Sequence, residues 1–147
     1  MTDAAKLLRE SATVVVVDWP SREVPEALVN AGLTVIVKGG PGPGDFSTWH
    51  STNGQLTAQD LGRPPERADL VYFHRPADEM PSIIQLAQNV GAKALWRQSG
   101  LTPDGAKSPR GCWVPAEESQ QGRDLAAAAD LDYVDNVYIV DALRASH

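Results

Sequence analysis

Two basic residues of this chain stand where they could bind an anionic ligand. Lys38 follows an apolar run and precedes Gly39 and Gly40, while Arg75 follows another apolar run in the segment Phe73-His-Arg-Pro76. The guanidinium of an arginine presents a planar fork of donors that suits a phosphate or a carboxylate. A basic residue at the end of the second strand of a nucleotide-binding fold suits a ribose phosphate, and the glycines after Lys38 would let a ligand approach the backbone.

Both residues also have plainer interpretations. Arg75 could pair with Asp78 or Glu79 at the start of the next helix, and an exposed lysine at a strand end is commonplace. His74 could act as a general acid or base, but the sequence offers it no nucleophile and no orienting partner. The chain has neither the Gly-x-Ser-x-Gly pattern of a nucleophile elbow nor a spacing of His and Asp typical of a metal site. The sequence therefore predicts a protein that is not an enzyme and holds no metal.

A polar turn and a tryptophan complete the candidate ligand site. Gln98 and Ser99 offer polar groups after a third apolar run, and Gly100 would permit close approach of a backbone. A helix cap or an ordinary turn is the alternative for this segment. Trp19, after the first apolar run, could stack on an adenine or could equally fill an empty pocket.

The elements that would carry these residues alternate between strands and helices. The expected strands are 13–17, 33–37, 70–73, 92–96 and 131–134. The expected helices are 3–10, 25–31, 82–90 and 119–129, with a further short helix in 137–143. The stretches 39–65 and 101–118 contain several Gly and Pro residues and are expected to be irregular.

This alternation predicts one α/β domain over residues 1–147, a three-layer Rossmann-like fold. Its doubly wound parallel sheet would have five strands in the order 3-2-1-4-5. Ligands of such sheets bind at the carboxyl ends of the strands, where the strand order reverses, and here that point would lie between strands one and four. The residues predicted to line the site are Trp19, Ser21, Arg22, Lys38, Gly39, Arg75, Gln98, Ser99 and Gly100.

Two of these segments resemble the motifs of a known family, the small stand-alone CoA-binding domain proteins. The family's Phe-Arg-Arg-Pro-like end to strand three corresponds to Phe73, Arg75 and Pro76, and its Trp-x-Gln-x-Gly end to strand four lies within 96–100. The resemblance is close over about residues 66–101. It implies a Rossmann-like fold similar to the N-terminal domain of the succinyl-CoA ligase alpha subunit, with CoA as the ligand. The chain departs from the family after strand one, where Asp18 replaces the usual glycine.

Composition limits the remaining possibilities. The net charge of −6 argues against binding to nucleic acid or to an anionic membrane, and the longest apolar runs are far too short to span a bilayer. A single cysteine, Cys112, excludes an intramolecular disulfide and suits the cytoplasm, where we expect the protein. We therefore expect a non-catalytic CoA- or nucleotide-binding module. The alternative is a scaffold whose ligand site has degenerated and which acts through protein contacts, with itself or with a partner.

Overall fold

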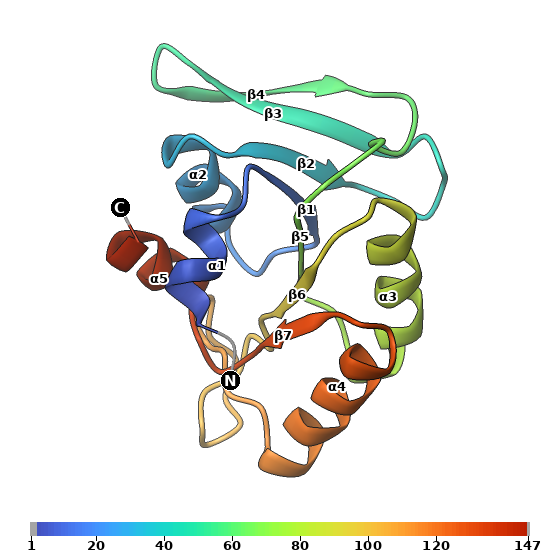
Figure 1. The fold of residues 1–147 in the computed structure, drawn as a ribbon. Helices are drawn as coiled ribbons and strands as arrows, with labels where there is room; N and C mark the ends of the chain where they lie inside the picture. The colour runs from blue at the N-terminus through green and yellow to red at the C-terminus, as the bar shows by residue number, and fades with distance from the viewer. Residues whose placement is uncertain (1–2, 147) are drawn as a thin grey trace.

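The structure, a computed structural model, describes residues 3–146 and contains one seven-stranded mixed sheet (Figure 1). Its spatial order is β4-β3-β2-β1-β5-β6-β7. Five strands are parallel: β1 (Thr13–Val17), β2 (Thr34–Lys38), β5 (Leu70–Phe73), β6 (Ala94–Arg97) and β7 (Asp132–Val134). The other two, β3 (Phe46–Thr52) and β4 (Gln55–Asp60), form an antiparallel hairpin at one edge.

Helices cover both faces of this sheet, which confirms the expected α/β architecture. One layer contains α1 (Ala4–Arg9), α2 (Glu23–Asn30) and α5 (Ile139–Ser146), and the other contains α3 (Met80–Asn89) and α4 (Ala116–Ala128) (Figure 1). A 3₁₀ turn, η1 (Ala77–Glu79), leads into α3. The side chains of β1 alternate between the two layers, with Val14 and Val16 in one core and Val15 in the other. Continuous β-branched residues suit such a strand because both of its faces are buried.

The strand order differs from the predicted one. Read along the chain, the five parallel strands stand in the order 2-1-3-4-5, so that β1 pairs with β2 on one side and with β5 on the other. The prediction placed the third strand beyond the second. That position is taken by β3, which pairs with the outer edge of β2, and the chain therefore returns to the other side of β1. The predicted count of five strands is wrong for the same reason.

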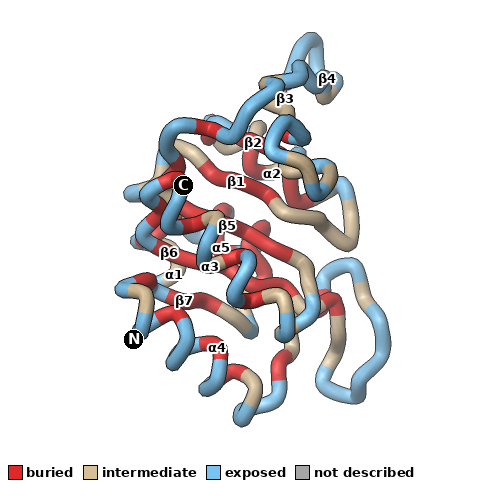
Figure 2. Tube along the Cα trace, turned by 90° about the vertical axis from the view of Figure 1, so that its right-hand side faces the viewer, coloured by how far each residue is buried: buried red, intermediate tan, exposed pale blue. Residues whose placement is uncertain are grey.

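The hairpin itself was not expected, because residues 39–65 were predicted to be irregular. Asn53 and Gly54, at its tip, both have positive φ angles, of 52° and 80°. Two such residues form the tight turn whose twist matches that of paired strands. Much of the hairpin beyond Phe46 is exposed, in contrast to the buried central strands (Figure 2). The other stretch, 101–118, is irregular as expected up to the start of α4, apart from one bridge between Leu101 and Lys107.

One carboxylate fixes β1 against β5 at the amino ends of the strands. Oδ2 of Asp69 accepts hydrogen bonds from the backbone N–H groups of Ala12 (2.7 Å) and Thr13 (2.9 Å). These bonds set the relative position of the two strands whose opposite ends carry the site. Within residues 3–146, no helix has both the length and the apolar character needed to cross a membrane.

Candidate functional site

A crevice of about 680 Å³ opens at the carboxyl ends of β1 and β2 and is closed on one side by α3. We call it the crevice; it is lined by 17–19, 38–41, Arg75, Glu79 and three residues of α3 (Ser82, Ile83 and Leu86). The chain runs from β1 to β2 on one side and reaches β5 on the other, so the sheet's switch point lies between β1 and β5. The predicted order had put the switch point between strands one and four. The crevice thus lies beside the position at which open α/β sheets bind ligands.

Asp18 brings a carboxylate to the crevice from the end of β1. Its φ angle of 61° is left-handed, and its Oδ1 accepts the N–H of Trp19 at 2.9 Å. Its Oδ2 lies 3.5 Å from Nδ1 of His74 and 3.6 Å from NH1 of Arg75. Because β1 and β5 are adjacent, the residues that follow them meet, and three charged or titratable side chains gather here.

Arg75 is already paired within the protein. Its NH2 lies 2.6 Å from Oε2 of Glu79, and its Nε donates to both carboxylate oxygens at 3.1 Å. This hydrogen bonding raises the pKa of Arg75 and lowers the pKa of Glu79, so both groups stay charged at neutral pH. Arg75 therefore pairs with Glu79, one of the two acidic residues available to it in the sequence. The side chain of Arg75 also lines the crevice.

Lys38 is the second cation of the crevice, and other side chains engage it less than they engage Arg75. Its Nζ donates to the carbonyl oxygen of Gly40 and lies 5.7 Å from the ring centroid of Phe46. The ion pairs among residues 3–146 do not include it. Gly39 donates its N–H to the carbonyl of Asp45 at 2.8 Å, which folds the loop after β2 back beside the lysine. An anion entering the crevice would find here an ammonium group that forms no ion pair with a carboxylate of residues 3–146.

Trp19 lines the crevice and also packs on the hairpin. Its ring meets that of Trp49 edge to face, with centroids 5.3 Å apart and an interplanar angle of 77°. The guanidinium carbon of Arg22 lies 5.6 Å from the centroid of Trp49, on the hairpin and outside the crevice. Ser21 is likewise absent from the lining. Of the turn after β1, the crevice therefore uses Asp18 and Trp19.

The predicted polar turn after β6 makes hydrogen bonds and packing contacts within the protein. Gln98 is 1% exposed; its amide accepts a hydrogen bond from the Tyr72 hydroxyl and donates to the Pro109 carbonyl at 2.9 Å. Ser99 accepts the N–H of Leu101 at 3.2 Å. Gly100 lies against the ring of His74, where an added Cβ would come within 2.6 Å of Nε2. None of the three lines the crevice, because β5 separates β6 from β1.

Sequence reasoning noted Asp18 after the first strand but did not name it as a ligand-binding residue, and it missed Glu79 as a member of the site. The signals were present, since Asp18 directly follows the first strand and Glu79 was one of two acidic residues available to Arg75. The correct strand order was needed to bring them together. The contribution of α3 through Ser82 and Ile83 could not be predicted for the same reason.

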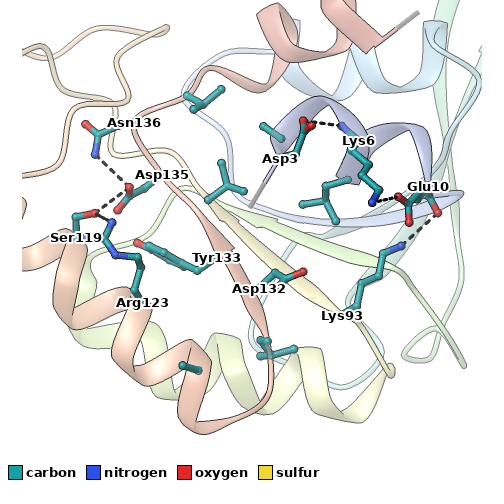
Figure 3. A pocket seen from close by; sticks show the side chains of 16 residues that line it. Asp3, Lys6, Glu10, Lys93, Ser119, Arg123, Asp132, Tyr133, Asp135 and Asn136 are labelled. Carbon is teal, nitrogen blue, oxygen red and sulfur yellow. Dashed lines mark hydrogen bonds and ion pairs between the residues drawn. The ribbon is translucent and has the colours of Figure 1, made fainter. Parts of the chain in front are cut away.

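A second hollow, of about 1040 Å³, runs along the free edge of β7 between α1 and α4 (Figure 3). Its polar groups are largely engaged with one another. Ser119 donates to Asp135 at 3.0 Å, Arg123 donates to Ser119 at 2.9 Å, and Asn136 donates to Asp135 at 3.1 Å. None of the predicted site residues lies there.

Two further observations bear on the chemistry available to the described residues. Burial raises the pKa of the Cys112 thiol to about 12, so this thiol is not a nucleophile at neutral pH. Within the part of the chain that the structure describes, no three His, Cys, Asp or Glu side chains are grouped so that they could hold a metal ion.

Comparison with known proteins agrees with this architecture. A solved structure described as cell-free ID.343 from Thermus thermophilus is similar over 99% of this chain and 100% of that one, with a TM-score of 0.59 and 15% sequence identity. At that identity the likeness concerns the fold alone. No curated protein matches the chain. A family model described as a CoA binding domain matches residues 14–142, and the chain therefore belongs to the CoA-binding domain family.

Proposed function

We propose that this protein is a non-catalytic CoA- or nucleotide-binding module whose ligand occupies the crevice. Membership of the CoA-binding domain family supports CoA as the ligand. The observation that carries the proposal for this chain is Lys38, a cation with no ion-pair partner in the described part of the chain, in a crevice beside the switch point of the sheet. The single free, half-buried cysteine suits a cytoplasmic protein, and we propose that location.

Lys38 and the loop after it would bind the ribose phosphate of the ligand. The ammonium group is a compact positive charge, and Gly39 leaves room for a ligand to approach the main chain. Trp19 offers an aromatic surface in the lining of the crevice, although part of that surface already packs on Trp49. Arg75 could contribute only by sharing its guanidinium between the ligand and Glu79.

The absence of catalysis is proposed from the way the charged groups are used. Asp18 and Glu79 both pair with Arg75, and His74 faces the carboxylate of Asp18. Such mutual pairing leaves no activated nucleophile beside a base in the crevice.

Isothermal titration of the purified chain with CoA, dephospho-CoA, NADP and ATP tests this function. Dephospho-CoA lacks the ribose phosphate, so the wild type should prefer CoA and Lys38→Ala should lose that preference. Lys107→Ala is the matched control, because Lys107 is exposed in the loop before α4. A bound ligand at 100 times its Kd should also stabilise the fold by about 2.7 kcal/mol in a thermal melt. Lack of binding by all four, and also by adenosine 3′-phosphate, at millimolar concentration would reject the proposal.

The carboxylate of Asp18 favours a second candidate function. A crevice that carries its own anion, with Arg75 held by Glu79, is also what a scaffold with a degenerate ligand site would show. Such a protein would act through contacts with a second copy or with another protein. Light scattering after size exclusion, combined with the titrations above, separates the two functions: self-association without nucleotide binding supports the scaffold.

A further inference from the structure

We propose that Asp18 determines which ligands the crevice accepts: it disfavours a pyrophosphate and leaves a site for one phosphate at Lys38. This inference rests on the proposed nucleotide-binding function and deepens it. The preferred ligand class would be a nucleotide with a single phosphate group, and CoA itself would bind weakly to the wild-type protein.

The carboxylate of Asp18 already faces the donors that an external anion would need. An anion over the end of β1 could reach the N–H of Trp19, the imidazole of His74 and the guanidinium of Arg75. Oδ1 of Asp18 takes the first of these, and Oδ2 lies within 3.6 Å of the other two. The remaining edge of the guanidinium is taken by Glu79. The carboxylate therefore stands in for a ligand anion on this side of the crevice.

The charges that line the crevice favour a single phosphate. Four ionised side chains line the crevice. Asp18 and Glu79 are acidic, and Lys38 and Arg75 are basic. Asp18 and Glu79 both pair with Arg75, which leaves Lys38 to balance the ligand. A single phosphate can be placed at Lys38, on β2. The second phosphate of a pyrophosphate would have to extend toward β1, where it meets the carboxylate of Asp18, which already faces the nearby donors.

The charge at residue 18 can be changed without disturbing the fold. The φ angle of 61° is one that glycine adopts freely and asparagine tolerates. Asp18→Gly removes the carboxylate, and Asp18→Asn keeps an oxygen that can accept the N–H of Trp19 while removing the charge. Neither substitution requires the backbone to move.

The chain also contains a matched control. Asp130 has a φ angle of 58°, is exposed, and precedes β7 at the opposite, amino-terminal edge of the sheet. Asp130→Gly therefore removes the same charge from the same backbone conformation, far from the crevice. It accounts for any general effect of net charge or of relieved backbone strain.

The test is titration calorimetry with CoA and with adenosine 3′-phosphate, which share the ribose phosphate and differ in the pyrophosphate arm. For CoA, both Asp18 variants should lower the Kd by about tenfold, because they remove the repulsion between the carboxylate and the pyrophosphate. For adenosine 3′-phosphate, the Kd should stay within about twofold, and Asp130→Gly should change neither value.

Three other results would overturn the inference, and the last of them would overturn the proposed function as well. If the wild type binds CoA as tightly as both Asp18 variants do, Asp18 does not select ligands and the inference is overturned, while nucleotide binding stands. A gain in Asp18→Gly alone would also overturn it, because bulk and not charge would then exclude the pyrophosphate. If no variant binds either ligand, the proposed function fails, and this inference fails with it.

Discussion

Arg75 and Glu79 form a bidentate ion pair across the first turn after β5, with NH2 2.6 Å from Oε2 and Nε 3.1 Å from both carboxylate oxygens. A guanidinium has five N–H donors in a fixed fork. Glu79 occupies one edge of that fork, and NH1 on the other edge faces Asp18 at 3.6 Å. Any ligand that uses Arg75 must therefore compete with two carboxylates.

Substitution of Glu79 by glutamine should make the crevice a better anion site. The neutral amide holds the guanidinium less strongly, so Arg75 becomes available to a phosphate. We expect the Kd for CoA to fall by up to about fivefold, the size of effect associated with exposed ion pairs. Calorimetry measures it, and Glu117→Gln, an exposed change of equal charge on α4, is the control. Equal affinities of wild type and Glu79→Gln would mean that Arg75 takes no part in binding.

Asp69 should make the fold sensitive to acid. Burial alone would raise its pKa, but the N–H groups of Ala12 and Thr13, together with Lys93 and Arg67, lower it below the usual 3.8. A carboxyl whose folded pKa is depressed contributes stability above its unfolded pKa, and that contribution is lost as the pH falls through the folded pKa. Asp69→Asn should therefore cost about 1 kcal/mol at pH 7. The difference from wild type should shrink below about pH 4.

Urea unfolding of both proteins from pH 7 to pH 2.5, followed by tryptophan fluorescence, measures that difference. Asp124→Asn is the control, because Asp124 is exposed on α4 and contacts the side chain of Gln120. A stability difference for Asp69→Asn that stays constant with pH would show that its charge does not matter.

Gln98 should prove to be a structural residue. Gln98→Leu leaves the buried hydroxyl of Tyr72 and the carbonyl of Pro109 without their partner. Burial raises the pKa of Tyr72, so its hydroxyl remains a donor that needs an acceptor. We expect a loss of about 2 kcal/mol in the free energy of unfolding, with the Kd for CoA unchanged at temperatures where the variant is folded.

A double-mutant cycle with Tyr72→Phe separates this role from ligand binding. Tyr72→Phe removes the same hydrogen bond from its other end, so the two changes together should cost less than their sum. Weaker CoA binding by Gln98→Leu at unchanged stability would instead make Gln98 a site residue, as the sequence predicted.

Gly122 should not tolerate alanine, although it lies within a helix. Alanine favours a helix over glycine by about 1 kcal/mol. An added Cβ would, however, lie 2.7 Å from both Cζ and the hydroxyl oxygen of Tyr133. We expect a net destabilisation of about 1 to 3 kcal/mol from overpacking. Thermal denaturation measures it, with Gln121→Ala on the exposed side of α4 as the control. A stabilised Gly122→Ala variant would show that Tyr133 can move away.

The strands could be predicted from the sequence where their apolar runs are short and sharply bounded. Thr13–Val17 and Leu70–Phe73 form strands with the predicted limits. The order of the strands could not be predicted, because an apolar run shows that a strand is buried and does not say which strand lies beside it. Asn53-Gly54 was the one local signal that would have revealed the hairpin, and the hairpin decides which edge of β2 is free.

The same limit explains the site. Trp19, Lys38, Gly39 and Arg75 lie around one crevice because each follows a strand end, which the sequence shows. Gln98 also follows a strand end, but β5 stands between its strand and β1. Position along a strand therefore predicts the edge of the sheet on which a residue lies, and neighbour order decides which residues meet there.

The left-handed backbone at residue 18 has a consequence for how this protein can evolve. The main chain there already has a shape that glycine favours. Aspartate and glycine codons differ only in the second base, so a single point mutation exchanges a carboxylate for a hydrogen atom while the backbone stays in place. A lineage carrying this gene could therefore change its ligand preference in one mutational step, without passing through a less stable intermediate.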